Sequence, residues 1–282
     1  MRKYILSIVL SLYSFILFAQ YHPSSNGELI EHQYYSLSYI EAHEQAEWVY
    51  YTIHAGNETR TDDFRPDPKV STKSATLADY KNSGYDRGHL CPAATMKLNH
   101  TSMSETFFMS NISPQEPNFN RGIWKNLEVL VREWGWNTKT HVVSGPIFKD
   151  NKGSIGANKV TVPSHYYKVI YQPSTQKMIG FVLPNQKSDK ELTQFIISVD
   201  SIETLTGINF FSQLDDTLEV QLESQLGNID DWQRKSNTTE SKTVKKKTST
   251  MQCKGIAKST GNRCKSKTNN TSGYCRHHLG QS

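Results

Sequence analysis

Residues 120–136 place the tightest limit on how this chain can fold. Large apolar side chains recur there three or four residues apart, the spacing of one face of an α-helix. The apolar positions are Ile123, Trp124, Leu127, Leu130, Val131 and Trp134. The spacing therefore predicts a helix over residues 120–136.

Four segments have the β-branched and aromatic composition of strands. They are residues 48–53, 141–148, 166–171 and 178–183. We expect the second to end around Gly145-Pro146, and the last two to form a hairpin joined by residues 172–175. Residues 200–206 have the pattern of a short helix closed by Gly207. Strands and helices do not alternate regularly, so the sequence predicts an α+β fold rather than a doubly wound parallel sheet.

The first twenty residues differ in character from the rest. Arg2 and Lys3 precede a run of about 15 almost wholly apolar residues that ends in the small Ala19. This layout is typical of a cleaved secretory signal; a membrane anchor is the alternative, but the run is shorter than the roughly 20 residues that span a bilayer. We predict cleavage after Ala19 or Gln20, a secreted or periplasmic location, and no stable membrane association after cleavage.

Charge is distributed unevenly along the chain, whose net charge is +5. Residues 233–282 hold 12 Lys and Arg and one acid, Glu240, for a net +11, whereas the remainder carries −6. A basic tail suits a polyanion such as nucleic acid, although Lys245-Lys246-Lys247 alone could equally be a solvated charge run.

The composition also predicts where the domains begin and end. Residues 1–20 are a signal peptide and residues 21–232 one main domain. Residues 233–251, rich in Lys, Ser and Thr, are typical of a basic linker. Residues 252–279 form a small C-terminal module.

The C-terminal module contains a cysteine and histidine pattern of the form C-x10-C-x10-C-x2-H. Its members are Cys253, Cys264, Cys275 and His278. Zn²⁺ takes four sulfur and nitrogen ligands, and Cys₃His is one of its ligand sets; His277 is the alternative imidazole. A segment this short and polar cannot bury a core, so a metal would supply folding energy. The segment resembles small zinc-ribbon-like Cys₃His modules.

A disulfide is the competing interpretation of these cysteines, since an oxidising compartment favours one. It would leave one of the three thiols unpaired unless that thiol reached Cys91. We therefore favour zinc.

A different set of chemical groups lies in Asp86-Arg87-Gly88-His89. Hydrolysis of a phosphodiester needs a base, a metal ion and cations that offset the charge on the phosphate. A neutral imidazole with an ordinary pKa of about 6.5 can be the base, and Arg87 can make a forked contact with phosphate oxygens. Gly88 allows the backbone to approach closely. The tetrapeptide alone is weak support, because a lone histidine is more often structural.

The following segment supplies oxygen ligands for a metal ion. It contains Asn111-Ile112-Ser113-Pro114-Gln115, then Asn118, Asn120, Trp124 and Glu128. One amide oxygen, from Asn120, fits a Mg²⁺ site that keeps several waters. Glu128 follows eight residues later, about 12 Å along a helix axis, so we expect it to hold a metal-bound water. A helix N-cap is the alternative for Asn120, and it is compatible with metal binding.

This series of motifs resembles the DNA/RNA non-specific endonucleases, the family of the Serratia nuclease and mitochondrial endonuclease G. The resemblance covers roughly residues 45–215. Further matching segments are Ala78-Asp79-Tyr80, Gly84-Tyr85, Ser144-Gly145-Pro146-Ile147-Phe148, Val162-Pro163-Ser164-His165-Tyr166-Tyr167-Lys168, Ile202-Glu203, Thr206-Gly207 and Phe210-Phe211. It implies a ββα-metal (His-Me finger) nuclease core, with a central, mostly antiparallel sheet and flanking helices.

The resemblance also implies roles for individual residues. His89 would activate water and Asn120 would bind Mg²⁺ directly. Glu128 would be the carboxylate that holds a metal-bound water, and Arg87 the cation that stabilises the phosphate in the transition state.

Two further roles follow from the same resemblance. Asn111 and Gln115 would be supporting polar groups near the scissile phosphate and the metal waters. The family has another arginine upstream; the spacing fits both Arg60 and Arg65, and we favour Arg60.

The implied activity is hydrolysis of DNA and RNA to 5′-phosphate products with little preference for sugar or sequence. The implied cofactor is Mg²⁺, with Mn²⁺ as an alternative, and a homodimer is compatible with the sequence. The competing function is a non-catalytic nucleic-acid-binding protein with a degenerate nuclease fold and a zinc-finger tail. The complete set of His89, Asn120 and Glu128 argues against it, because binding alone needs no base. A secreted toxin nuclease is a third interpretation, for which no delivery domain is visible.

Overall fold

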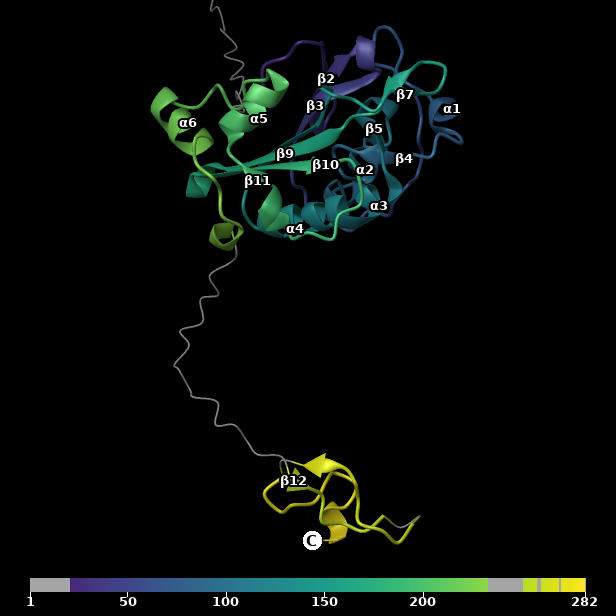
Figure 1. Ribbon diagram of the computed structural model, residues 1–282, viewed down its shortest axis with the longest axis vertical. Helices are drawn as coiled ribbons and strands as arrows, with labels where there is room; N and C mark the ends of the chain where they lie inside the picture. The colour runs from purple at the N-terminus through teal and green to yellow at the C-terminus, as the bar shows by residue number, and fades with distance from the viewer. Residues whose placement is uncertain (1–20, 233–250, 258–259, 269, 282) are drawn as a thin grey trace, which may run out of the picture. The chain divides into compact units, whose positions relative to one another are not determined.

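The computed structural model describes residues 21–232, 251–257, 260–268 and 270–281 (Figure 1). The chain divides into two compact units, Met1–Arg234 and Lys235–Ser282. The predicted signal peptide, and residues 233–250 of the predicted linker, lie outside the described residues.

A seven-stranded antiparallel sheet forms the centre of the first unit. Its strands in spatial order are β1 (Glu28–Glu31), β2 (Tyr35–Ile40), β3 (Gln45–Thr52), β6 (His141–Ile147), β9 (His165–Gln172), β10 (Lys177–Pro184) and β11 (Ile196–Ile197). The four predicted strands correspond to β3, β6, β9 and β10, which are neighbours in the sheet. The α+β prediction is therefore confirmed.

The strand predicted to end around Gly145-Pro146 continues one or two residues further, to Ile147. Gly145 and Pro146 stay in the strand and pair with Tyr167 and Tyr166 of β9, so β6 continues to Ile147. Proline fits here because β3 pairs with β6 only as far as Ser144, so at Pro146 the strand has a neighbour, β9, on one side alone. The predicted hairpin is present: β9 and β10 are joined by the short 3₁₀ turn Pro173–Thr175.

Side chains alternate along β9 and so divide the core between two faces of the sheet. Tyr166 and Ile170 pack in one apolar cluster with α4 (Lys125–Gly135). Tyr167 and Val169 belong to a second cluster, with α5 (Val199–Thr206) and α6 (Asp216–Glu223). Figure 1 shows α4 on the opposite side of the sheet from α5 and α6. The sheet is therefore covered by helices on both faces.

The predicted helix at 120–136 is interrupted and begins earlier than expected. It consists of α3 (Pro117–Phe119), one π-helical turn (Asn120–Trp124) and α4. Its N-cap is Glu116, whose carboxylate accepts a hydrogen bond from the N–H of Phe119 at 2.8 Å. The N-cap alternative for Asn120 is thus wrong, because its backbone is helical (φ −57°, ψ −48°). The turn departs from helical geometry at Gly122 (φ −104°, ψ −113°), and helix kinks often occur where glycine or a π-bulge interrupts the ladder.

A separate two-stranded ribbon positions the chemically interesting residues. β4 (Asp86–His89) pairs antiparallel with β5 (Ile112–Gln115), with Asp86 opposite Gln115 and His89 opposite Ile112. The hydroxyl of Tyr166 donates to the carbonyl of Pro114 at 2.8 Å and so ties the ribbon to the large sheet. The ribbon and the helix after it form the predicted ββα unit.

The remaining elements are short. They are α1 (Leu77–Tyr80), α2 (His100–Glu105), β7 (Ser154–Ile155), β8 (Val160–Thr161), and the 3₁₀ turns Glu41–His43, Ala93–Thr95, Met109–Asn111, Leu192–Phe195 and Ile229–Trp232. In the second unit β12 (Met251–Gln252) pairs with β13 (Lys267–Thr268), and a 3₁₀ turn, Leu279–Gln281, follows. Within the described part of the chain, every helix is too short or too polar to cross a bilayer.

We predict that His141 makes the fold sensitive to acid. It is 1% exposed, the hydroxyl of Tyr50 lies 2.6 Å from its Nδ1, and burial lowers its pKa to about 4. The unfolded imidazole takes up a proton below about pH 6.5, whereas the folded one stays neutral. The stability present above pH 6.5 is therefore lost as the pH falls towards 4.

When the pH is lowered from 7 to 5, this imidazole should lower the free energy of unfolding by about 2 kcal/mol, since one pKa unit corresponds to about 1.4 kcal/mol. Urea unfolding at both pH values should show that the wild-type protein loses that much more than His141→Gln. Equal losses in the two proteins would contradict this assignment.

Candidate active site and metal sites

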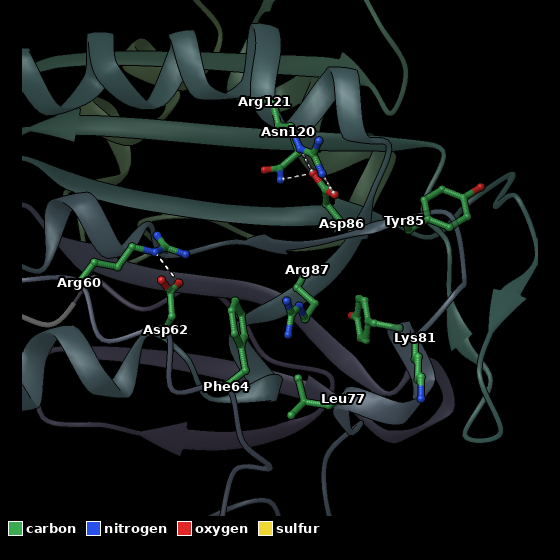
Figure 2. Close-up of a pocket in the computed structure, with 11 residues that line it drawn as sticks. Arg60, Asp62, Phe64, Leu77, Lys81, Tyr85, Asp86, Arg87, Asn120 and Arg121 are labelled. Carbon is green, nitrogen blue, oxygen red and sulfur yellow. Dashed lines mark hydrogen bonds and ion pairs between the residues drawn. The ribbon is translucent and has the colours of Figure 1, made fainter.

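A cavity of about 530 Å³ opens beside the ribbon and the start of the helix (Figure 2). It is lined by Arg60, Asp62, Phe64, Leu77, Tyr80, Lys81, Tyr85, Asp86, Arg87, Asn120 and Arg121. Four of these residues are cationic and two are acidic, so the lining is net positive although the main domain is net negative. Of the predicted site residues, Arg60, Arg87 and Asn120 line this cavity directly.

The carboxylate of Asp86 joins β4 to the helix. It accepts hydrogen bonds from Nδ2 of Asn120 at 2.9 Å and from Nε and Nη2 of Arg121 at 2.8 and 2.6 Å. Because Nδ2 is used in this way, Oδ1 of Asn120 is turned away from Asp86, as Figure 2 shows. A carboxylate in this position therefore sets which end of the amide can act as a ligand.

Two phenylalanine rings support the cationic side of the site. The guanidinium of Arg87 lies 4.2 Å from the ring centre of Phe64, and that of Arg60 lies 4.8 Å from the ring centre of Phe107. The ring of His89 is 5.6 Å from Phe64 and 5.0 Å from Phe107. The two rings thus hold both arginines and the histidine in one neighbourhood.

His89 does not line the cavity, but the cavity's charges act on it. Burial lowers its pKa to about 3, with Arg60 and Arg87 adding to the effect and Asp62 opposing it. Its Nε2 atom is buried and makes no hydrogen bond. The imidazole is therefore neutral at physiological pH, which a general base requires.

Gln115 packs directly over Gly88. A Cβ atom built on Gly88 would lie 2.2 Å from Cδ and Oε1 of Gln115, so only glycine leaves room for this side chain. The amide of Gln115 is fully buried and has no hydrogen-bond partner. Gln115 therefore supports the ribbon one residue before the base.

Asn111 is not among the residues that line the cavity. Its side chain is fully buried; Oδ1 accepts from the N–H of Cys91 at 2.8 Å. Its Nδ2 donates to the carbonyls of Cys91 and Thr106 at 3.0 and 2.8 Å. With both ends of the amide used inside the protein, Asn111 holds the backbone that follows His89.

Glu128 lies on α4 and does not line the cavity; the buried ammonium group of Lys168 acts on its carboxylate. Burial raises its pKa, while Lys168, Arg132 and Arg60 oppose that rise. Lys168 is fully buried on β9, and burial lowers its pKa. Its Nζ donates to Oγ of Ser144 at 3.0 Å and lies 4.6 Å from the ring centre of Trp124.

The structure separates the two candidate upstream arginines. Nη1 of Arg65 donates to the backbone and carboxylate of Asp63, and its Nη2 donates to Oγ of Ser104. Arg60 instead lines the cavity, with its Nε 2.6 Å from the carboxylate of Asp62. The geometry favours Arg60, as the sequence analysis did.

Several residues of this site were missed by sequence reasoning. The sequence indicates Asp86 only as part of a motif and gives no sign of a role for Arg121, which adjoins Asn120. Their charges are opposite, but nothing in the sequence says that residues 35 apart form a pair. Phe64 and Phe107 gave no signal at all, because isolated aromatic residues are common in cores.

The C-terminal unit contains a second candidate metal centre. The ligand atoms of Cys253, Cys264, Cys275 and His278 all lie within 4.8 Å of one another. His277 is exposed, and its Nε2 accepts a hydrogen bond from Arg276. A Cys₃His cluster is therefore present, and His278 is its imidazole.

The residues around the cavity fit a hard divalent cation. Mg²⁺ prefers oxygen ligands, keeps several waters and is commonly bound by one or two protein groups. Oδ1 of Asn120 offers one such oxygen beside the cationic lining. Asp86 is committed to Asn120 and Arg121, so it orients the ligand rather than competing for the ion.

Comparison with known proteins gives consistent results. Residues 16–217 match a family described as DNA/RNA non-specific endonuclease. Nuclease C1 of Cunninghamella echinulata var. echinulata is 35% identical over 218 residues, 68% of this chain and 86% of that protein. Human mitochondrial endonuclease G is 33% identical over 214 residues, 68% of this chain and 72% of that protein.

A solved structure is also similar. A chain in the crystal structure of an EndoG/EndoGI complex superposes with a TM-score of 0.61 at 33% identity, covering 67% of this chain and 87% of that one. At 33% identity the two chains are similar in sequence as well as in fold. The family match ends at residue 217, before the second unit begins.

We predict that Asp86 controls the metal requirement. In Asp86→Asn the amide of Asn120 loses the charged acceptor that fixes its orientation. The Mg²⁺ concentration for half-maximal cleavage of duplex DNA should then rise about tenfold, the equivalent of about 1.4 kcal/mol. Asp62→Asn removes a carboxylate that lines the same cavity but pairs with Arg60, and its metal requirement should stay within about twofold of wild type. An unchanged requirement in folded Asp86→Asn would refute this role.

Proposed function

Because the chain belongs to the DNA/RNA non-specific endonuclease family, we propose that it is a secreted, Mg²⁺-dependent enzyme that hydrolyses both DNA and RNA. The family is metal-dependent and the enzyme is a hydrolase; the choice of Mg²⁺, with Mn²⁺ as the alternative, is part of the proposal. The observation that carries it is one neighbourhood with an oriented amide oxygen, a neutral imidazole and two arginines.

The base in this proposal is His89. Its depressed pKa leaves the ring neutral, so it can accept the proton of an attacking water as the oxygen bonds to phosphorus. The proton then resides on the imidazole until solvent removes it. The leaving group is the 3′ oxygen of a sugar, which takes a proton from solvent, so the phosphate stays on the 5′ oxygen of the next nucleotide and the product carries a 5′-phosphate.

The arginines offset the charge that gathers on the phosphate in the transition state. Arg87, exposed and stacked on Phe64, has no carboxylate partner among the described residues, so its donors are available to phosphate oxygens. Arg60 forms an ion pair with Asp62, and both side chains are exposed. An exposed pair of this kind contributes little to stability, so a phosphate can readily replace Asp62 as the partner of Arg60.

A bound Mg²⁺ would be held by Oδ1 of Asn120 and would supply Lewis-acid stabilisation of the phosphate and the leaving oxygen. Glu128 would hold a water of that ion, as the family resemblance implies. Burial raises the pKa of Glu128, while Lys168 and Arg132 favour the ionised form that such a role needs.

The chemistry of the lining supports weak discrimination between nucleic acids. Contacts with phosphates carry no direct sequence information, and they do not depend on the 2′ position of the sugar. Four cations therefore suit a substrate recognised by its backbone. A binder that has lost catalysis would need neither the neutral His89 nor the oriented Asn120 amide.

Secretion is proposed from the sequence, on the apolar run and small residue before position 20.

A digestion assay tests the proposed reaction. Purified protein should cut plasmid DNA and structured RNA with Mg²⁺, stop on addition of EDTA, and recover when excess Mg²⁺ is restored. His89→Ala should lower kcat/KM by at least about a hundredfold, the usual scale of a general base. A folded His89→Ala protein that cuts both substrates at the wild-type rate would refute the mechanism.

The two upstream arginines should respond differently to substitution. Arg60→Ala should lower kcat/KM about tenfold or more with little change in Tm, because it removes a cation from the cavity. Arg65→Ala should lower Tm by a few degrees instead, because it breaks hydrogen bonds to Asp63 and Ser104. The assignment is reversed if Arg65→Ala loses activity at unchanged Tm and Arg60→Ala does not.

A further inference from the structure

The interior of the C-terminal unit consists of potential metal ligands rather than apolar side chains. Of its described residues, Cys253 is fully buried, Cys275 is 7% exposed and Thr268 is 8% exposed. The larger apolar residues are outside: Met251 and Ile256 are each 46% exposed. Burial of so little apolar area cannot offset the entropy of ordering the chain, so the unit needs a cross-link.

The distances between the ligand atoms are those of one tetrahedral site. A Zn–S bond of about 2.3 Å separates two thiolates of a tetrahedron by about 3.8 Å. Here Sγ of Cys264 and Sγ of Cys275 are 4.0 Å apart. Nδ1 of His278 is 3.6 Å from Sγ of Cys253 and 3.3 Å from Sγ of Cys275.

Backbone donors support thiolate character at this cluster. The N–H groups of Gly255 and Cys275 donate to Sγ of Cys253 at 3.3 and 3.1 Å. Gly255 has no room for a side chain, since a Cβ atom there would lie 2.4 Å from Cγ of His278. The loop after Cys253 is therefore wrapped against the imidazole, which brings this ligand close to the thiol of Cys253.

A disulfide explains this geometry less well. Its S–S bond is about 2.05 Å, and it would use two of three converging thiols and leave the imidazole without a function. All four cysteines of the chain are described and free, and Cys91 is fully buried in the first unit.

The surface around the cluster carries only positive charge. Between residues 251 and 282 the sequence has six Lys and Arg and no acid. Lys254, Lys265, Lys267, Arg263 and Arg276 are exposed, and Arg263 also donates to the carbonyl of Cys253 and so helps to build the unit. An exposed cationic surface without acids suits a phosphate backbone.

We propose that Cys253, Cys264, Cys275 and His278 bind one Zn²⁺, and that the ion organises a cationic module which binds the phosphate backbone of nucleic acid. The zinc site stands by itself. The choice of nucleic acid as the polyanion rests on the proposed function of the first unit. The module would raise the local concentration of substrate near the cavity without taking part in the chemistry.

Metal analysis of the full-length chain tests the site. Elemental analysis should give one zinc per chain, and replacement by Co²⁺ should give thiolate-to-metal charge-transfer absorption. Cys275→Ser and His278→Ala should lose the metal, whereas His277→Ala, at the neighbouring exposed imidazole, should keep it. A chain without zinc, or an intact mass 2 Da lower from a disulfide, would overturn the proposal.

Binding to DNA tests the surface, on a His89→Ala background that does not cut. Fluorescence anisotropy with a labelled duplex should show that Lys265→Glu/Lys267→Glu weakens affinity about tenfold. The slope of log K against log salt should fall by about 2, nearly one per lost phosphate contact. The matched control is Lys187→Glu/Lys190→Glu, which makes the same charge change at exposed lysines of the first unit. An unchanged slope, or an equal loss in the control, would refute binding by the module.

The two proposals fail in different ways. Cleavage of a short oligonucleotide at saturating concentration depends on the cavity alone, so Lys265→Glu/Lys267→Glu in the otherwise wild-type chain should leave kcat unchanged while KM rises. Loss of zinc with intact kcat would separate the module from catalysis. Intact zinc and DNA binding in a chain that never cuts would refute the nuclease mechanism alone.

Discussion

The carboxylate of Asp86 is the interaction on which the rest of the active site depends. Asp86 begins the strand whose last residue is His89, and it accepts hydrogen bonds from Asn120 and Arg121 on the helix. Two motifs far apart in the chain are thereby fixed against each other. Without that acceptor, the Asn120 amide could rotate and present its N–H groups where an oxygen ligand is needed.

The cations of the cavity have two effects that reinforce each other. They attract phosphate, and they add to the effect of burial, which lowers the pKa of His89 to about 3. A phosphate bound beside Arg60 and Arg87 would neutralise part of that charge and make the imidazole a stronger base when substrate is present. The net charge of −6 outside the tail does not oppose this at short range, because salt screens charges beyond about 10 Å.

The sequence predicted what depends on local pattern and missed what depends on contacts across the fold. Apolar periodicity identified the helix and the central strands, and the order of the motifs indicated the candidate base and the candidate metal ligand. It could not show that Glu116 caps the helix or that the turn breaks at Gly122, since both depend on how the helix meets the ribbon. Nor could the sequence show that the Asn111 amide makes all its hydrogen bonds inside the protein, or that Lys168 lies buried near Glu128. These residues are polar, and polarity alone predicts exposure.

The central claim is that a neutral imidazole at position 89 removes the proton from the attacking water. Chemical rescue tests it most directly: His89→Gly should be nearly inactive, and added imidazole should restore cleavage. The rescued rate should increase with imidazole concentration and, across pH, follow its unprotonated fraction. Wild-type cleavage by His89→Gly without imidazole, or rescue that follows the protonated form, would contradict the account.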